Sequence, residues 1–297
     1  MLVKTTRAKC VFELMDGEEI STPCWVNPII PRQGKVILGS YAKAGKTACM
    51  LSIIRALVTG ENLFNCPRYT IPEPANVLIF EQELGEAGFQ RRIKKVFHGI
   101  SRRKSVKYLS RDSDVSFSDH KGIELIGNEI ADARPNIVIL DPIGAMFHGD
   151  ENSSQEIGMF WREINRMLAM GVREDMTFII SHHFGKRPNG KAAENFDFLD
   201  PYNFRGSGKW YDAPDTMITM NRLQDINVQG HRAWRLQMRI TLRQDEPQPE
   251  IYCTVNRDGD LRVLYERDVD PPQPVTTPAP MRVNLGRNNV TTNPTRQ

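Results

Sequence analysis

Five short apolar runs constrain the fold of this chain more than any other feature of its sequence. They lie at residues 36–38, 77–80, 137–140, 177–180 and 216–220. Each run is too short and too rich in β-branched residues for a helix, and such runs are typical of parallel strands buried on both faces. Helical patterns lie between them, at residues 46–58, 85–98 and 154–170. This alternation predicts βαβ units, and therefore an α/β fold with a mostly parallel central sheet flanked by helices.

The two ends of the chain differ from this central region. Residues 8–32 alternate loosely between apolar and polar and end in prolines, which predicts a short strand or hairpin in an N-terminal segment, 1–34. Residues 230–265 have the pattern of two or three antiparallel strands, so we expect these at the C-terminal edge of a core that spans 35–267. Residues 268–297 hold six of the nineteen prolines and no aromatic residue, which predicts a disordered tail.

The composition excludes several classes of protein. Of the 297 residues, 40% are hydrophobic and 25% are charged, which excludes a wholly disordered, fibrous or membrane-embedded chain. The 39 basic and 36 acidic residues give a net charge of +3, which neither favours nor excludes nucleic acid as a partner. The five cysteines show no metal-binding spacing, and the first residues show no signal-peptide pattern. We therefore expect free thiols, no membrane contact and a cytoplasmic protein.

Residues 36–47 have the pattern of a P-loop, in which a buried strand leads through a loop into a helix that begins with Gly-Lys-Thr. Backbone N–H groups of such a loop surround the phosphates of a nucleoside triphosphate; the lysine, here Lys46, reaches the β- and γ-phosphates, and the hydroxyl of Thr47 binds Mg²⁺. The pattern also places a glycine at position 40, where this chain has serine, and Gly39 comes one residue early. The expected phosphate-binding residues are Ser40, Tyr41, Ala42, Lys43, Ala44, Gly45, Lys46, Thr47 and Ala48.

Carboxylates follow two of the predicted strands. Asp141 comes directly after the run 137–140, where an NTPase of this kind places a carboxylate for the Mg²⁺ shell. Glu81 and Glu83 come after the run 77–80, and hydrolysis needs a group there that orients the attacking water. The alternation of side chains along a strand does not choose between the two glutamates.

Two histidines, His182 and His183, follow the run 177–180. Adjacent residues on a strand point to opposite sides, so the pair is a poor metal site. A polar group that touches the γ-phosphate is the better interpretation, and ordinary histidines at a strand end are the alternative.

In this order, these motifs resemble the RecA-like ATPase core, and specifically its branch of hexameric replicative helicases. The likeness is strongest to plasmid RepA-type helicases and their phage relatives, with DnaB-type helicases more distant, and it covers about residues 23–260. It rests on Glu83-Leu84 with Phe89 and Arg91-Arg92, on Asp141-Pro142-Ile143 with the loop 147–153, on His182-His183-Phe184-Gly185-Lys186, on Arg205-Gly206-Ser207-Gly208 and on Leu242-Arg243.

The resemblance implies an ATPase that uses ATP and Mg²⁺. It selects Glu83 over Glu81 as the catalytic glutamate. It identifies Asp141 as the Walker B aspartate, which shares the metal with Thr47.

The resemblance also assigns roles to four further residues. Lys46 and His183 contact the phosphates, and His183 stands where DnaB- and RecA-type proteins carry glutamine. Arg243 matches the position of a Lys/Arg finger that completes the nucleotide site of a neighbouring subunit. Arg205, in its Arg-Gly-Ser segment, is expected to serve the same neighbouring site.

The leading hypothesis is a ring-forming, ATP-driven motor on single-stranded DNA, with a hexameric ring as the expected assembly and a filament as the other form. Its expected DNA-binding residues lie in the loop 185–203, where basic side chains are interleaved with aromatic ones that suit base stacking. The basic residues are Lys186, Arg187 and Lys191, and the aromatic ones are Phe184, Phe196, Phe198 and Tyr202.

Two other hypotheses stay open. One is a recombinase or annealing protein that forms filaments on single strands, with ATP as a switch. The other is an ATPase that remodels a protein partner and does not bind DNA.

Overall fold

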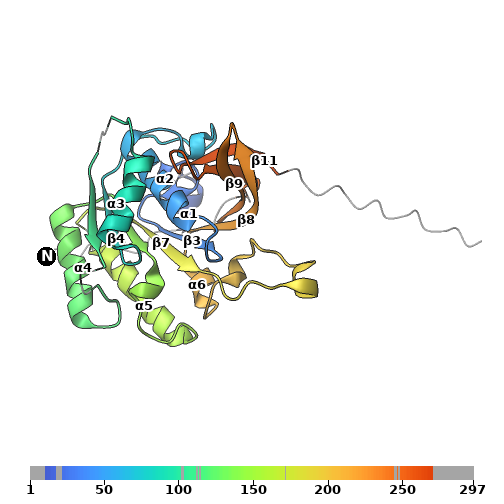
Figure 1. Cartoon of the computed structure of the whole chain (residues 1–297). Coiled ribbons are helices and arrows are strands. Elements are labelled where there is room, and N and C mark those ends of the chain that lie inside the picture. Colours follow the sequence, from blue (N-terminus) through green and yellow to red (C-terminus); the bar gives the residue numbers. More distant parts are fainter. Residues whose placement is uncertain are drawn as a thin grey trace, which may run out of the picture.

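All five apolar runs are strands of one nine-stranded sheet in the computed structural model, which describes residues 11–17, 22–101, 104–111, 113, 115–170, 172–243, 246 and 248–269 (Figure 1). The strand order is β11-β10-β9-β8-β3-β7-β6-β4-β5. The five predicted strands are β3 (Lys35–Ser40), β4 (Val77–Glu81), β6 (Ile137–Asp141), β7 (Thr177–His183) and β8 (Thr216–Val228). The predicted α/β fold with a mostly parallel central sheet is therefore confirmed.

Burial on both faces explains why the parallel strands have continuous apolar runs. Every residue of β4 and β6 is buried, and alternate residues of β3 belong to two separate hydrophobic clusters, with Val36 and Leu38 in one and Ile37 in the other. The parallel register pairs Ser40 with His183 and Glu81 with Asp141. The carboxyl ends of β3, β4, β6 and β7 therefore meet at one edge of the sheet.

Helices cover both faces of the sheet (Figure 1). The predicted helices are α2 (Lys46–Thr59), α3 (Gly85–Val96) and α5 (Ser154–Ala169), whose ends differ by one or two residues from the predicted ones. Residues of α2 and α3 pack in one cluster, while those of α5 and of α4 (His120–Ala133) pack in the other. Short helical segments are η1 (Leu63–Asn65), η2 (Ile143–Ala145), η3 (Gly190–Ala193), η4 (Pro201–Asn203) and α6 (Lys209–Asp212).

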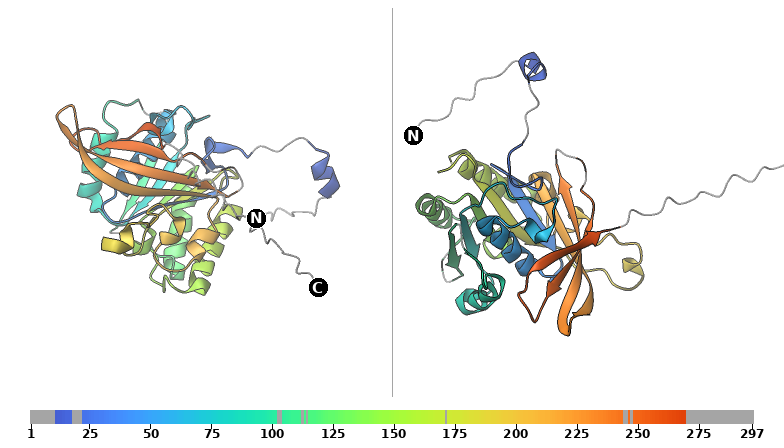
Figure 2. Two further views of the ribbon diagram at one scale, coloured as in Figure 1. Left: turned by 90° about the vertical axis from the view of Figure 1, so that its right-hand side faces the viewer. Right: turned by 90° about the horizontal axis from the view of Figure 1, so that it is seen from above.

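The predicted antiparallel strands lie at one edge of the sheet (Figure 2). They are β9 (His231–Leu242), β10 (Ile251–Asn256) and β11 (Val263–Asp268), and each pairs antiparallel with its neighbour. Their buried side chains pack in the same cluster as α2. Residues 244, 245 and 247 of the predicted turn between β9 and β10 lie outside the described residues.

Four features differ from the sequence-based expectations. α4 and the edge strand β5 (Val106–Ser110) were not expected, and β5 lacks an apolar run because its first three residues are exposed. In the N-terminal segment, β1 (Cys24–Val26) and β2 (Ile30–Pro31) form the expected hairpin, but Val11–Met15 forms a short helix, α1, instead of a strand. Asp268, the first residue of the predicted tail, ends β11, and its carboxylate accepts hydrogen bonds of 2.6 and 2.7 Å from Arg68. Residues 270–297 lie outside the described part of the chain.

In the part of the chain that the structure describes, every helix is too short or too polar to cross a membrane.

Candidate active site

The loop between β3 and α2 has the backbone of a phosphate-binding turn. Lys43 and Gly45 have φ angles of +62° and +106°, and Gly45 is the residue that precedes α2. Backbone in this left-handed region favours glycine, and a Cβ atom on Gly45 would lie 3.2 Å from the indole nitrogen of Trp234. The backbone conformation therefore favours glycine at position 45, and a larger residue would also crowd Trp234.

The neighbouring strand explains why the first glycine of the motif stands at 39 and not at 40. Ser40 is fully buried and still part of β3, where it pairs with His183 on one side and Met220 on the other. A Cβ atom on Gly39 would lie 2.4 Å from the ring of Phe204 and 2.6 Å from that of Phe184. Gly39 therefore makes room for two aromatic rings, whereas Ser40 needs no special backbone conformation.

Lys46 and His183 meet at the centre of the site. The Nζ atom of Lys46 lies 2.8 Å from Nδ1 of His183, and the lysine is only 8% exposed. Burial lowers the pKa of Lys46 to about 8, against the opposing effect of the Asp141 and Glu83 carboxylates. The pKa of His183 is also lowered, by burial first and then by the Lys46 charge. The contact is therefore a hydrogen bond from the lysine ammonium to a neutral imidazole.

Asp141 ends β6 as a buried carboxylate. Ser181 donates a hydrogen bond of 2.5 Å from Oγ to Oδ1 of Asp141. Burial raises the pKa of Asp141 to about 6, although the Ser181 hydrogen bond and the Lys46 charge act in the opposite direction. A buried anion of this kind gains stability from a nearby cation.

The residues present fit a Mg²⁺ ion that is shared with bound phosphates. Thr47 and Asp141 both line the same cavity and supply a hydroxyl and a carboxylate oxygen. Within the described residues, no group of three or more His, Cys, Asp or Glu side chains could hold a metal by itself. Mg²⁺ is commonly bound by one or two protein oxygens together with substrate phosphates and water, which is the arrangement that these two residues allow.

The two glutamates after β4 have different surroundings. Glu81 is 1% exposed, and its Oε1 atom accepts hydrogen bonds from the backbone N–H groups of Glu83 (3.1 Å) and Leu84 (2.7 Å). Glu81 therefore stabilises the turn from β4 into α3. Glu83 is exposed and lines the cavity with Lys46 and Asp141. This geometry favours Glu83 as the residue that contacts reacting groups.

The cavity, of about 530 Å³, has a second wall that the sequence motifs did not reveal. Arg222 of β8 and Trp234 of β9 form part of it. The guanidinium of Arg222 lies 4.9 Å from the centroid of the Trp234 ring and donates a hydrogen bond of 3.3 Å to the backbone oxygen of Lys43. The β8–β9 hairpin thus contacts the P-loop and supports it through the hydrogen bond of Arg222. Other lining residues outside the predicted set are Leu84, Arg92, Arg257 and Leu261.

The sequence offered only one signal for this wall. Arg92 belongs to the Arg91-Arg92 pair that carried part of the family resemblance. Arg222, Trp234 and Arg257 come from antiparallel strands and a turn whose sequences match no motif, and only the folding of the sheet brings them to the P-loop.

The structure does not bring the two predicted finger arginines to the phosphate site of their own chain. Arg243 follows β9, whose last residue pairs with Thr216, which in turn pairs with Val36 at the start of β3. Its guanidinium donates to the backbone oxygens of Asp212 and, at 3.4 Å, of Ala213. Arg243 therefore lies near the amino end of β3, whereas the P-loop follows the carboxyl end of that strand.

Arg205 lies nearer to the site but points away from it. Its backbone N–H donates to the His183 oxygen (3.0 Å), while its side chain is 67% exposed and its Nε lies 2.7 Å from Oε2 of Glu151. The guanidinium is therefore engaged by the loop that follows β6.

The three basic residues of the predicted DNA loop are exposed, but their surroundings differ. Arg187 lies 4.8 Å from the centroid of the Phe198 ring and donates a hydrogen bond of 3.3 Å to Asn221. Lys186 and Lys191 have no comparable contact with the described residues. Arg187 thus holds the loop against β8, whereas the two lysines extend into solvent.

The expectation that the loop aromatics are free to stack on bases needs correction. Phe184 is 4% exposed and packs against Tyr41 and Phe204. Phe196 and Phe198 pack on one another, with ring centroids 5.1 Å apart. Tyr202 is 66% exposed, although one of its faces already stacks on Tyr211. Packing therefore removes Phe184 from base stacking, whereas Phe196, Phe198 and Tyr202 keep exposed surface.

The comparisons with known proteins give one match. No curated protein matches the chain. Residues 6–189, more than half of the 297 residues, match the family described as an AAA domain, AAA_25, a P-loop ATPase domain found in RecA-like helicases. The match includes the P-loop, Glu83, Asp141 and the Lys46–His183 contact. The chain therefore belongs to the AAA_25 family of AAA domains and is a nucleotide-hydrolysing P-loop ATPase.

Proposed function

We propose that this ATPase is a ring-forming motor that moves on single-stranded DNA, of the RepA-type replicative helicase kind. One observation carries the proposal. His183 contacts the P-loop lysine at 2.8 Å, and the chain continues from it within three residues to the exposed Lys186. A change in the phosphates around Lys46 would therefore reach the basic loop through a single short piece of backbone, which is what a motor that couples hydrolysis to DNA needs.

The residues of the cavity divide the hydrolysis reaction among them. The P-loop amides and Lys46 hold the phosphates, and Thr47 and Asp141 would hold Mg²⁺, which supplies positive charge against the phosphate oxygens when it is bound. Glu83 orients a water molecule toward the γ-phosphorus and accepts its proton. The bond between the β–γ bridging oxygen and the γ-phosphorus breaks, so that ADP and inorganic phosphate are the products. His183 contacts the γ-phosphate and responds to its loss.

The position of Arg243 supports an assembly in which copies complete each other's sites. Ser40 lies four residue steps along β3 from Val36, a rise of about 13 Å at roughly 3.3 Å per residue, and Arg243 lies at the Val36 end. It cannot reach the phosphates of its own chain across the sheet. If Arg243 is a finger residue, it therefore acts on the nucleotide of a neighbouring copy.

A measurement of ATP hydrolysis with and without single-stranded DNA, combined with particle images and a strand-displacement assay, tests the proposal. We expect stimulation by DNA, ring-shaped particles and ATP-dependent displacement. DNA-stimulated hydrolysis in filaments without displacement would support the recombinase or annealing hypothesis instead. Hydrolysis that DNA leaves unchanged, with no DNA binding, would support an ATPase that remodels a protein partner.

A further inference from the structure

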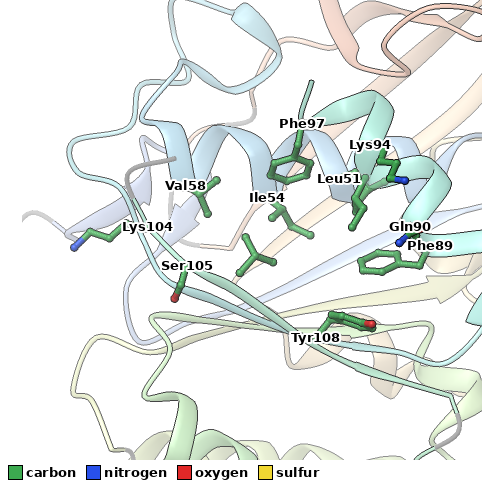
Figure 3. Close-up of a pocket in the computed structure, with 12 residues that line it drawn as sticks. Leu51, Ile54, Val58, Phe89, Gln90, Lys94, Phe97, Lys104, Ser105 and Tyr108 are labelled. Atoms are coloured by element: carbon green, nitrogen blue, oxygen red, sulfur yellow. The ribbon is translucent and has the colours of Figure 1, made fainter. Parts of the chain in front are cut away.

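An apolar groove lies between α2, α3 and the edge strand β5, on the part of the molecule away from the P-loop wall formed by β8 and β9 (Figure 3). Its volume is about 590 Å³. The lining is mostly aliphatic and aromatic, with a few polar residues. The lining residues are Leu51, Ile54 and Val58 of α2, Phe89, Gln90, Ile93 and Lys94 of α3, and Phe97, Lys104, Ser105, Val106 and Tyr108.

The outer side of the groove is partly exposed. Val106 and Tyr108, on the last strand of the sheet, are 39% and 42% exposed. The Tyr108 ring packs on Phe89, with centroids 5.5 Å apart, and its hydroxyl donates a hydrogen bond of 3.1 Å to Glu86. Exposed apolar side chains beside an apolar hollow mark a place where another surface can dock. The residues proposed for catalysis and DNA contact do not use it.

The same chain carries an unpaired apolar surface of matching character. The helix α1 has the sequence Val-Phe-Glu-Leu-Met, and Val11, Phe12 and Met15 are 74%, 69% and 70% exposed. Residues at spacings of three and four share one face of a helix, so these three side chains form one apolar face. A helix of five residues is not stable in water without a partner surface. Figure 2 shows α1 outside the body formed by the sheet and its helices.

The charges of the two surfaces are also complementary. Lys94 and Lys104 flank the groove, and Arg91 and Lys95 add further exposed positive charge on α3. Asp16, directly after α1, is exposed and acidic. An apolar face beside this negative charge thus meets an apolar groove beside positive charge, which favours one orientation of docking.

We propose that this groove binds the α1 helix of a second copy of the chain. In the structure, α1 does not cover the groove of its own chain. Each copy therefore has an exposed apolar helix face and a partly exposed apolar groove. Exchange from copy to copy buries both in every subunit, and it is a head-to-tail contact of the kind that generates rings and filaments. The inference rests on the assembly part of the proposed function and not on its DNA part.

The groove is connected to the active site through its helices. Its floor is α2, which begins with the P-loop residue Lys46, and one wall is α3, which begins two residues after Glu83. Docking of α1 would therefore restrain the two helices that position both catalytic loops. We expect hydrolysis to depend on protein concentration for this reason.

Cross-linking between two differently substituted full-length chains tests the contact directly. One chain carries Phe12→Cys and the other Val106→Cys, both with Cys10→Ser, and a short bismaleimide is added to the mixture. The cysteines at 24, 49, 66 and 253 are buried. We expect a cross-linked pair of unlike chains. The matched control replaces Val106→Cys with Met159→Cys, an exposed apolar position (50%) on α5, and should give no such product.

Substitutions on either surface give a second measurement. Phe12→Glu and Val106→Glu should each raise the concentration at which half of the protein is assembled by at least about tenfold, because an apolar anchor at an interface contributes on that scale. Met159→Glu should leave that concentration unchanged. Circular dichroism and thermal melting confirm that each variant is folded.

Four results would overturn the inference, three of them seen with mixed or wild-type chains. They are assembly without the Phe12–Val106 cross-link, equal cross-linking with the Met159 control, and a wild-type protein that stays monomeric at all concentrations. A chain that carries both Phe12→Cys and Val106→Cys and links only to itself would also overturn it, since α1 would then occupy its own groove. Cross-linking and assembly without DNA-stimulated hydrolysis would leave this inference standing and contradict the proposed motor.

Discussion

The Nζ atom of Lys46 lies 2.8 Å from Nδ1 of His183, so a hydrogen bond joins the P-loop to the neighbouring strand. The lysine ammonium has three donors, so it can bind a phosphate oxygen while it still donates to the imidazole. The other ring nitrogen of His183, Nε2, then carries the proton and can donate to a phosphate oxygen. The shared lysine thus links nucleotide binding to the end of β7 and to the loop that follows.

The first prediction concerns pH. The pKa of Asp141 is raised to about 6 and that of Lys46 is lowered to about 8, both chiefly by burial. Below pH 6 the free protein loses the carboxylate that would hold Mg²⁺, and above pH 8 it loses the ammonium charge that attracts phosphate. Affinity for Mg²⁺–ADP, measured by calorimetry, should therefore be highest between about pH 6 and 8 and fall on both sides. A profile that stays flat from about pH 5 to 9 would contradict these shifts.

The second prediction separates the two glutamates. Glu83→Gln should still bind ATP but hydrolyse it about 10²- to 10⁴-fold more slowly, because an oriented base contributes on this scale. Glu81→Ala should instead lower thermal stability, since two backbone N–H groups of the turn lose their acceptor, and a typical intramolecular hydrogen bond contributes about 0.5–1.5 kcal/mol. Single-turnover hydrolysis and thermal melts of both variants provide the comparison. Normal hydrolysis by Glu83→Gln alongside an inactive but stable Glu81→Gln would reverse the assignment.

The third prediction concerns the shifted glycine. Gly39→Ala should destabilise the protein by about 1–3 kcal/mol, as overpacking does, because the new methyl group would overlap the rings of Phe184 and Phe204. Ser40→Gly, which restores the usual motif, should give no faster hydrolysis and should cost about 0.5–1 kcal/mol as a glycine within a strand. Urea denaturation and ATPase assays check both. Faster hydrolysis by Ser40→Gly would mean that position 40 belongs to the phosphate-binding turn.

The sequence predicts the parallel strands well because burial on both faces leaves continuous apolar runs, as in β4 and β6. It does not predict β5, since an edge strand with exposed residues lacks that pattern. The glutamates show a similar limit. Glu81 and Glu83 are two residues apart, and only the turn into α3, where Glu81 accepts two backbone hydrogen bonds, distinguishes them.

The sequence also could not predict which distant residues the pairing of strands brings to the P-loop. Arg222 and Trp234 reach the P-loop because β8 pairs with β3, and β9 with β8. No local pattern encodes that register. The burial of Phe184 was missed in the same way, because this residue becomes buried only when β7 lies beside β3.

The fourth prediction concerns action between subunits. Arg243→Ala should be nearly inactive alone, as should Lys46→Ala, which cannot hold the phosphates. Mixing the two variants should restore part of the ATPase activity, because some interfaces then combine an intact P-loop with an intact arginine. The control is Arg232→Ala, which removes an exposed arginine paired with Asp258. This variant should be active by itself, without mixing. Co-assembled mixtures without any restored activity would argue against a finger in trans.

The last prediction concerns the loop after His183, and the structure changes which residues it involves. Lys186 and Lys191 extend into solvent, whereas Arg187 is held by Phe198 and Asn221. The variant with both Lys186→Ala and Lys191→Ala should bind single-stranded DNA more weakly. The slope of its log affinity against log salt should become shallower by roughly 0.7 for each DNA phosphate that is no longer neutralised, about 1.4 in total.

Arg187→Ala should act differently, because it frees the loop from β8 and its effect on DNA binding should come with greater protease sensitivity between residues 185 and 203. Lys121→Ala, an exposed lysine on α4, serves as the control for a general loss of charge. Hydrolysis without DNA should persist in the double lysine variant, since both side chains lie beyond the Lys46–His183 hydrogen bond. An unchanged salt slope in that variant would show that the lysines are only solvated, and would favour the protein-remodelling hypothesis over the DNA motor.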